Sequence, residues 1–292
     1  MPAQSTSFPD VAGTIAIGGD LRVARLGFGA MRITGQGVWG DPPDRKAAIA
    51  LLRHVVARGV NFIDTADSYG PGTSEDLIAE ALHPYPSGLV ITTKGGYRRP
   101  GPGVWEADGA PASLRAACHA SLKRLKLSRI DLYQLHGVDS KVPLAESMGA
   151  LVDLQKEGKI RHIGISNVSL AQLSEARALA TVVSVQNRYN VEDRAFDGVL
   201  DAASKDGLAF LPWRPLGAGN LSNPASKIHE VAKRHGATPL QVGLAWLLKR
   251  APLMLPIPGT SSIKHLEDNL SAAALRLTGE DMAALSAAPP KP

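Results

Sequence analysis

This sequence has few cysteines and few aromatic residues, and neither sign of charge is in strong excess. Cys118 is the only cysteine among 292 residues, which excludes an intramolecular disulfide and a structural zinc site built from cysteines. Lysine and arginine number 32 against 27 acidic residues, for a formal net charge of +5. Short basic runs such as Lys123–Lys126 are typical of solvated helix faces. We therefore expect no nucleic-acid partner, and no cluster with metal-ligand spacing is visible.

Long hydrophobic runs are also missing. The longest apolar stretches, such as Val242–Leu248, fall far short of the ~20 residues that a membrane span needs. Residues 1–19 lack the basic start and apolar core of a signal peptide. We therefore expect a soluble, cytoplasmic protein with no membrane partner. No internal linker is apparent, so residues 1–292 are expected to form one domain, whose oligomeric state stays open and is compatible with a monomer.

What the sequence does have is a regular alternation of short β-rich runs and helical patterns. The eight β-rich runs are Ala24–Phe28, Asn61–Asp64, Leu89–Thr93, Asp131–Leu135, His162–Ile165, Val182–Gln186, Ala209–Leu211 and Met254–Pro256. Apolar residues at helical spacing mark Ala47–Arg58, Ser113–Leu125, Leu144–Glu157 and Thr238–Arg250. Helix starts are expected at the N-caps Ser74, Ser113 and Thr238, with Pro239 in a first helical position.

Eight strands, each followed by a helix, predict a closed (β/α)8 TIM barrel. An open doubly wound sheet is the alternative. A nucleotide-binding sheet of that kind usually carries a Gly-x-Gly-x-x-Gly turn, and the glycine pairs Gly27/Gly29 and Gly217/Gly219 both lack its third glycine. Thr14–Ile17 and Leu21–Val23 flank a Gly-Gly pair and predict a β-hairpin that could plug the bottom of the barrel. The loop Gly95–Ala110 is too long for a simple connector and is a candidate lid.

Polar residues follow one predicted strand after another. Catalytic residues of β/α barrels lie at these carboxyl ends, because the loops that follow converge there. The polar strand ends are Asp64, Lys94, His136, Ser166-Asn167, Gln186-Asn187, Trp213-Arg214 and Pro258–Ser262. A single lysine or histidine at such a place is usually a surface or structural residue. Repetition over successive strands predicts an active site on this face.

Three residues near this face can form a proton relay, and a fourth can orient the substrate. Tyr69 lies five residues after Asp64, so its loop can return the phenol over the mouth of the barrel. A free tyrosine has a pKa of about 10, which is too high for efficient proton donation at neutral pH. The ammonium of Lys94 is expected to lower that pKa, with Asp64 keeping the lysine charged. His136 is expected to donate a hydrogen bond that orients a carbonyl oxygen.

Seven motifs, taken in order and spacing, then carry a family resemblance. They are Leu26–Met31, Asn61–Gly70, Ile91–Lys94, Asp131–His136, Ile163–Asn167, Val185–Asn190 and Leu255–Thr260. From about Val23 to Asn269 the chain resembles the aldo-keto reductases. The resemblance implies an oxidoreductase that reduces an aldehyde or ketone, and a catalytic tetrad of Asp64, Tyr69, Lys94 and His136 with Tyr69 as general acid and base. It also implies a nicotinamide cofactor extended across the barrel mouth.

The same resemblance assigns residues to the cofactor. Ser166, Asn167 and Gln186 would hold the nicotinamide carboxamide, and Trp213 would stack on the ring, its alternative being a core tryptophan. The whole implied set is Gly29, Ala30, Met31, Asp64, Ser166, Asn167, Gln186, Trp213, Arg214, Pro215, Leu216, Gly217, Gly219, Pro258, Gly259, Thr260, Ser261, Ser262, His265, Asp268 and Asn269. Relatives with a similar Gly-Thr-Ser-Ser loop mostly use NADP(H), so we expect NADP(H) rather than NAD(H). Many relatives carry serine in place of Arg214, which leaves its role open.

Specificity should come from the loops around the mouth. The expected substrate pocket consists of Met31, Trp39, Tyr69, Tyr97, Trp105 and Tyr189, and such aromatic walls favour a flat or apolar carbonyl compound. Arg98 and Arg99 either receive an anionic substrate or form a solvated loop pair. Gly37–Gly40 and Ala237–Leu248 resemble bacterial pyridoxal reductases, although His136 is not shared by all of those relatives.

These observations leave more than one function open. A general aldehyde or ketone reductase, a pyridoxal reductase and a cofactor-binding auxiliary subunit of an ion channel are all compatible with the resemblance. A barrel isomerase or lyase is disfavoured, because its usual phosphate loop and metal ligands are missing from the sequence.

Overall fold

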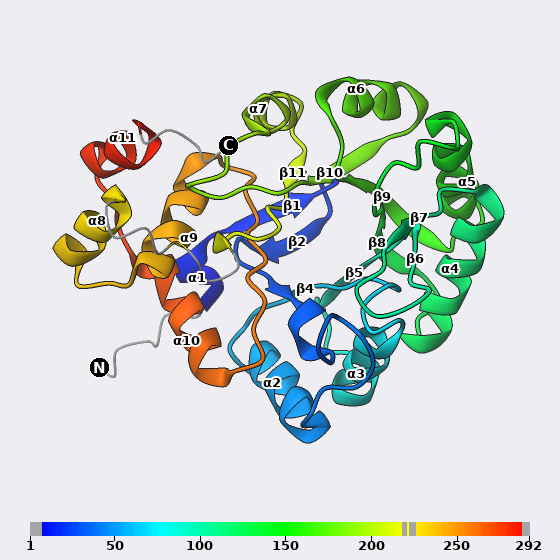
Figure 1. Cartoon of the computed structure of the whole chain (residues 1–292), viewed down its shortest axis with the longest axis horizontal. Coiled ribbons are helices and arrows are strands. Elements are labelled where there is room, and N and C mark those ends of the chain that lie inside the picture. The colour runs from blue at the N-terminus through cyan, green and yellow to red at the C-terminus, as the bar shows by residue number, and fades with distance from the viewer. Residues whose placement is uncertain (1–7, 218–220, 222–225, 288–292) are drawn as a thin grey trace.

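Parallel strands ringed by helices form the centre of the molecule (Figure 1). This computed structural model describes residues 8–217, 221 and 226–287. Seven strands hydrogen-bond side by side in the order β11-β10-β9-β8-β5-β4-β3, and the register of each neighbouring pair is parallel. They are β3 Phe28–Gly29, β4 Phe62–Asp64, β5 Val90–Gly95, β8 Ile130–Leu135, β9 Ile160–Ser166, β10 Val182–Gln186 and β11 Ala209–Phe210.

Residues 253–258 close this sheet into a barrel by pairing with both of its edge strands. The closing hydrogen bonds run from Phe210 N to Leu253 O (3.0 Å), Leu255 N to Phe210 O (2.9 Å), Gly27 N to Pro256 O (2.9 Å) and Gly29 N to Pro258 O (3.4 Å). The predicted (β/α)8 barrel is therefore confirmed. The predicted strand Met254–Pro256 is only a single bridge between Phe210 and Met254, because prolines in this segment have no N–H to donate to a regular ladder.

The first predicted strand also differs from the structure. Ala24–Phe28 was expected to be one strand, but Ala24 ends the preceding hairpin and β3 begins only at Phe28. The hairpin itself is as predicted: β1 Thr14–Ile17 pairs antiparallel with β2 Leu21–Ala24. Its inward side chains pack with strand residues in one buried cluster: Ile15, Ile17, Leu21, Val23, Phe62, Val90, Leu132, Leu211 and Leu255. The hairpin thus plugs the bottom of the barrel.

Side chains alternate between the inside and the outside of the barrel along each strand. On β4, Phe62 belongs to the inner cluster and Ile63 to the outer core that packs against the helices. Each inward series therefore runs from an apolar residue at the bottom to a polar one at the mouth: Phe62 to Asp64, Val90 to Lys94, and Leu132 to His136. This alternation is what gathers the polar strand ends inside the mouth.

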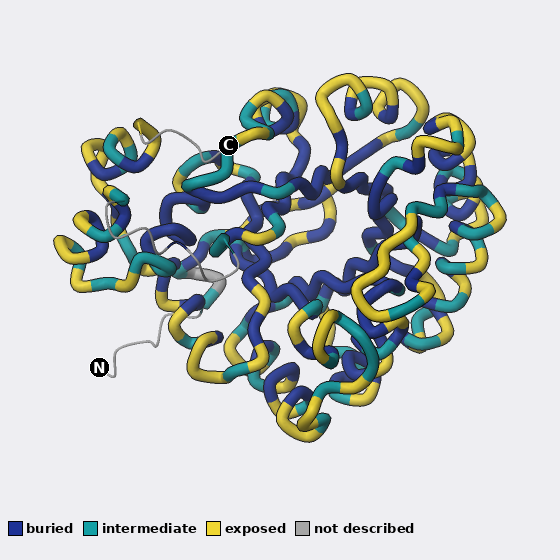
Figure 2. The backbone as a smooth tube through the Cα atoms, viewed as in Figure 1, coloured by how far each residue is buried: buried dark blue, intermediate teal, exposed yellow. Residues whose placement is uncertain are grey.

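Helices cover the outside of the strands. They are α1 Phe8–Ala12, α2 Arg45–Ala57, α3 Thr73–Leu82, α4 Pro111–Arg124, α5 Leu144–Lys156, α6 Leu170–Leu179, α7 Asp197–Lys205, α8 Lys227–His235, α9 Pro239–Arg250, α10 Ile263–Ser271 and α11 Gly279–Ala287, with 3-10 turns η1 Ala30–Ile33 and η3 Ala272–Ala274. In Figure 1, α2 to α7 surround the strands and α8 to α11 gather at the left. Figure 2 shows buried backbone in the barrel wall and exposed backbone along the outer helices. No helix among the described residues is long and apolar enough to cross a membrane.

One of the three predicted helix caps is confirmed. Thr238 accepts a hydrogen bond from the backbone of Gln241 in a capping box, and Pro239 begins α9. The other two are wrong, because α3 begins at Thr73 after a left-handed Gly72 and α4 begins at Pro111. The hydroxyl of Ser74 is instead buried inside α3, 2.7 Å from the Thr65 hydroxyl, and Ser113 lies within the first turn of α4.

The candidate lid is an ordered hairpin. Within residues 95–110, β6 Tyr97–Arg98 pairs antiparallel with β7 Glu106–Ala107. A single parallel bridge joins Trp39 to Gly70 on the neighbouring loops. Arg99 of the hairpin donates hydrogen bonds to Val38 O and Ser68 O, so the loops that follow β3, β4 and β5 meet on the mouth side of the barrel.

Candidate active site

Asp64, Lys94 and Tyr69 form a buried hydrogen-bonded group inside the mouth. The ammonium nitrogen of Lys94 lies 2.7 Å from Asp64 Oδ2 and 3.4 Å from the Tyr69 hydroxyl. It also donates to the carbonyl oxygen of Thr65 at 2.8 Å. The Lys94 side chain is fully buried and that of Asp64 is 3% exposed. The structure therefore brings together the three residues expected in the relay, with the lysine between the other two.

Two glutamine side chains hold the second oxygen of Asp64. Gln186 Nε2 donates to Asp64 Oδ1 at 2.8 Å, and Gln134 Nε2 donates to the same oxygen at 3.3 Å. Gln134 also reaches the Thr92 hydroxyl at 3.1 Å. Gln186 was expected on the cofactor, whereas Gln134 was not singled out. The signal for Gln134 was its strand parity, since it lies two residues before His136 on the inward face of β8.

The pKa of Lys94 behaves as expected. Burial alone would lower it, but the Asp64 carboxylate and the Tyr69 hydroxyl outweigh burial and raise the pKa above its ordinary value. Lys94 is therefore a buried ammonium at neutral pH.

The pKa of Tyr69 departs from expectation. The charge of Lys94 does lower it, but burial of the phenol raises it more, and the nearby negative charge of Asp64 adds to that rise. The net pKa of Tyr69 therefore lies above 10.0. Burying a phenolate here raises the pKa by more than the neighbouring ammonium lowers it.

His136 completes the group from the next strand. Its Nδ1 lies 3.2 Å from the hydroxyl oxygen of Ser68, a residue that the sequence did not single out. Its ring meets that of Tyr69 edge-on, with centroids 5.8 Å apart. Burial, followed by the charge of Lys94, holds the pKa of His136 well below 6.5. The imidazole is therefore neutral at physiological pH, and Nε2 is the nitrogen left for a substrate.

An aromatic wall stands beside this group. The Tyr97 ring lies 4.9 Å from that of His136, and the Trp105 ring lies 6.2 Å from His136 and 6.4 Å from Tyr69. Trp105 is 38% exposed, so part of its surface is open to a ligand. Tyr97 and Trp105 thus lie where the sequence placed the pocket, and Met31, in η1, is half-buried.

Tyr189 does not join this wall. It is fully buried, stacks on Trp246 with centroids 5.9 Å apart, and meets Phe210 edge-on. Its hydroxyl donates to Asp197 at 2.5 Å. The loop after β10 turns this side chain outward, between the barrel and α7, so the expected pocket residue is part of the core.

The two arginines of the hairpin differ in their exposure and in their partners. Arg98 has a 67% exposed side chain and pairs with Glu106 at 3.1 Å and Asp108 at 3.2 Å. Arg99 is only 8% exposed, and its guanidinium lies 3.8 Å from the centre of the Trp105 ring. A solvated pair therefore describes Arg98 but not Arg99.

A ledge of amide and hydroxyl groups borders the other side of the mouth. Asn167 Nδ2 donates to His136 O at 2.9 Å, and the Trp213 indole N–H donates to Asn167 Oδ1 at 2.9 Å. Ser166 Oγ donates to Gln186 O at 2.7 Å. Trp213 is partly exposed rather than buried in the core. The ledge thus presents an aromatic face, held by an amide, next to the relay.

The family follows from a comparison with known proteins. The model of the aldo/keto reductase family matches residues 25–289. This chain belongs to the aldo/keto reductase family. An uncharacterized oxidoreductase of Schizosaccharomyces pombe is 47% identical over 94% of this chain and 89% of its own length. The pyridoxine 4-dehydrogenase of Escherichia coli is 44% identical over 91% of this chain and 95% of its own.

A solved structure has the same fold as this aldo/keto reductase. The enzyme from Klebsiella pneumoniae, determined in complex with NADP and acetate, matches with a TM-score of 0.80 at 28% identity. The match covers 96% of each chain. The resemblance read from the sequence is therefore confirmed at the level of family and fold.

Several other residues that the sequence assigns to the cofactor lie near the closing segment of this aldo/keto reductase. Ser262 caps α10 by accepting from the backbone of His265 at 3.4 Å, and Thr260 Oγ1 accepts from Ser262 N at 3.0 Å. Ser261, Lys264 and His265 are exposed at this helix start. An exposed helix N-terminus with a neighbouring lysine is suited to a phosphate group.

Other expected cofactor residues hold the barrel seam or lie farther along α10. A Cβ at Gly259 would lie 2.7 Å from the Gly29 carbonyl oxygen, so these two glycines allow the seam to close. Ala30 is fully buried, and its carbonyl accepts from Ser74. The other positions are exposed Arg214 and Asp268, buried Pro215, Asn269 and Pro258, and partly exposed Leu216 and Gly217, while Gly219 lies outside the described residues. Within residues 8–217, 221 and 226–287, no three metal-ligating side chains gather.

Proposed function

We propose that this protein is an NADP(H)-dependent reductase that converts an aldehyde or ketone to an alcohol, with Tyr69 as the proton donor. The observation that carries this proposal is the buried ammonium of Lys94, which reaches both Asp64 and the Tyr69 hydroxyl. A buried charge of this kind costs several kcal/mol unless it is paired. Placed beside a phenol, the ammonium stabilises the phenolate that remains after the proton has been given away.

Tyr69, His136 and Lys94 have separate roles in this reduction. A substrate carbonyl oxygen that enters beside Tyr69 accepts a hydrogen bond from its hydroxyl and a second from Nε2 of neutral His136. Bound NADPH supplies the hydride that reduces the carbonyl carbon. Tyr69 transfers its proton to the oxygen, and the phenolate is held by Lys94 until water returns the proton. Alcohol oxidation follows the same path in reverse, with the phenolate as base.

The residues of the mouth fit a nicotinamide dinucleotide. The Trp213 face and the amides of Asn167 and Gln186 offer a flat surface with polar groups at its edge, as a carboxamide-bearing ring requires. The exposed start of α10 lies in the segment that follows the barrel seam, and it offers backbone N–H groups and Lys264 to phosphate oxygens. These groups support NADP(H), with the extra phosphate at α10, in preference to NAD(H).

The substrate that we propose to test first is pyridoxal, a flat aromatic aldehyde. Support comes from the edge-on wall of Tyr97 and Trp105 and from 44% identity to the E. coli pyridoxine 4-dehydrogenase. A wider range of aromatic aldehydes or ketones is expected to fit the same wall.

Oxidation of NADPH by pyridoxal and by an activated aromatic aldehyde tests the function. We expect turnover by the wild type and its near-complete loss in Tyr69→Phe, with the Kd for NADPH unchanged. Tyr85→Phe is the matched control, because its hydroxyl binds the Leu125 carbonyl at 2.7 Å, outside the site. Tight NADPH binding by a wild type that reduces no carbonyl compound would instead favour an auxiliary, cofactor-sensing subunit.

A further inference from the structure

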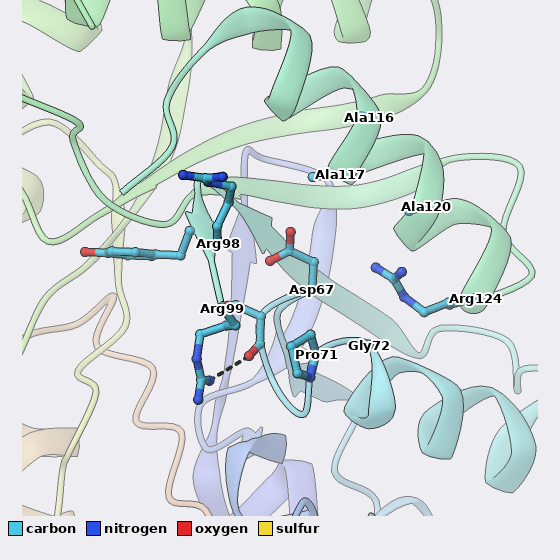
Figure 3. A pocket seen from close by; sticks show the side chains of 11 residues that line it. Asp67, Pro71, Gly72, Arg98, Arg99, Ala116, Ala117, Ala120 and Arg124 are labelled. Atoms are coloured by element: carbon cyan, nitrogen blue, oxygen red, sulfur yellow. Dashed lines mark hydrogen bonds between the residues drawn. The ribbon is translucent and has the colours of Figure 1, made fainter. Parts of the chain in front are cut away.

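Arg99 ties three loops of the barrel mouth together. It follows β6 and is almost fully buried, with 8% exposure. Its hydrogen bonds run from Nε to Val104 O (2.9 Å), from Nη1 to Ser68 O (2.9 Å) and Val38 O (3.1 Å), and from Nη2 to Gly37 O (3.1 Å). These acceptors belong to the loop after β3, the loop after β4 and the hairpin after β5. Figure 3 shows the bond to the loop after β4 as a dashed line, with Arg98 pointing away from it.

The same guanidinium lies between two tryptophans. It is 3.8 Å from the centre of the Trp105 ring and 5.7 Å from that of Trp39. A guanidinium is attracted to the face of an indole ring at these distances. Trp105 in turn meets both Tyr69 and His136 edge-on, so Arg99 lies against the ring that faces the relay.

The hydrogen bonds of Arg99 argue against a role in binding an anionic substrate. A guanidinium has five N–H groups, and Arg99 uses four of them on backbone carbonyl oxygens. Within residues 8–217, 221 and 226–287, no carboxylate forms a salt bridge with it. Its positive charge is therefore directed at carbonyl oxygens and ring faces, and at most one N–H remains for a ligand.

We propose that Arg99 is a positioning residue that sets the specificity of this site for flat aromatic carbonyl compounds. By fixing Trp105 and Trp39, it holds the walls against which an aromatic ring lies while its carbonyl reaches Tyr69 and His136. A small aliphatic aldehyde makes little use of these walls. This inference rests on the reductase function proposed above, and it assigns the ring-binding part of the pocket to one buried side chain.

Arg99→Lys tests the proposal, because lysine keeps the charge but cannot supply the planar, four-bonded contact. We expect the ratio of kcat/KM for an aromatic aldehyde over kcat/KM for propanal to fall about tenfold. The fall should come through a higher KM for the aromatic aldehyde, with its kcat changed less than about twofold. The Kd for NADPH should stay unchanged. Arg98→Lys, at the neighbouring exposed arginine, is the matched control and should leave the ratio unchanged.

Near-UV circular dichroism separates this inference from the proposed function. Loss of the guanidinium should change the tryptophan bands in Arg99→Lys and leave them unchanged in Arg98→Lys. If the wild type reduces no carbonyl compound, the proposed function fails, while this spectrum still tests the hold on the tryptophans. Unchanged bands, or an equal loss of kcat/KM for aromatic and aliphatic substrates, would overturn the role of Arg99.

Trp105→Leu keeps the experiment decisive if Arg99→Lys does not fold. It removes the ring that Arg99 covers and leaves the four hydrogen bonds of Arg99 in place. We expect the same selective fall in the aromatic-to-aliphatic ratio. A ratio equal to that of the wild type would contradict the proposal.

Discussion

Lys94 Nζ and Asp64 Oδ2 lie 2.7 Å apart in a place where the lysine is fully buried. Neither group would be stable there alone, because an unpaired charge in a buried site costs several kcal/mol. The pair places a permanent positive charge 3.4 Å from the Tyr69 hydroxyl. Both the reactivity and the pH dependence of the site follow from this arrangement.

Lys94→Met should remove most of the activity. The phenolate of Tyr69 then loses its neighbouring charge, and Asp64 is left buried without its partner. We expect kcat for carbonyl reduction to fall roughly 100-fold or more, as measured by NADPH oxidation under saturating substrate. Lys123→Met, on the exposed face of α4, is the control. Activity within about twofold of the wild type would contradict the role of Lys94.

The pKa of Tyr69 gives a pH dependence of known sign. Because this pKa is raised above 10.0, the hydroxyl keeps its proton through neutral pH. Reduction, which consumes that proton, should therefore not decline between about pH 6 and 9 through loss of the Tyr69 proton. Alcohol oxidation needs the phenolate and should increase with pH over the same range. The two rates can be measured in buffers of constant ionic strength, and an oxidation rate that falls with pH would contradict this assignment.

Strand alternation made much of this site predictable. Asp64, Lys94 and His136 each lie an even number of residues after an inward apolar residue of the same strand, so parity alone carries them into the mouth. The direction of a side chain in a loop could not be predicted in this way. Tyr189 lies only three residues after the end of β10, but the loop turns it into the core.

The burial of Arg99 could not be predicted from a local pattern either. Nothing in the pair Arg98-Arg99 indicates which arginine is buried, because the answer depends on how the hairpin pairs and on carbonyl groups of two other loops. Ser68 was missed for a similar reason: its partner, His136, lies 68 residues farther along the chain. Contacts of this kind are properties of the assembled mouth rather than of a local pattern.

Asp281 should stabilise the docking of α11 in a pH-dependent way. Burial would raise its pKa, but hydrogen bonds from Arg234, the Thr278 backbone and His235 outweigh burial and lower it. A lowered pKa in the folded state means that the stabilisation is full above the unfolded pKa of about 3.9 and is lost as the pH falls through the folded value.

Asp281→Asn tests this contribution. At pH 7 we expect it to reduce the free energy of unfolding by about 2 kcal/mol, since charged hydrogen bonds are lost from a buried group. The difference from the wild type should shrink below about pH 4, as urea denaturation at several pH values would show. Glu280→Gln, which is exposed on the same helix, should have little effect. A difference that stays constant with pH would mean that the carboxylate charge is not what stabilises α11.

Ser68 should act through the imidazole of His136. If its hydroxyl donates to Nδ1, the proton of the neutral ring is placed on Nε2, where it can bind a substrate oxygen. In Ser68→Ala this preference is lost, and we expect kcat to fall about tenfold with the Kd for NADPH unchanged. Ser68→Thr keeps the hydroxyl and should restore most of the rate. A purely structural role would instead lower the melting temperature in Ser68→Ala and leave kcat of the folded enzyme intact, because the ring would still present a proton at Nε2 without help from Ser68.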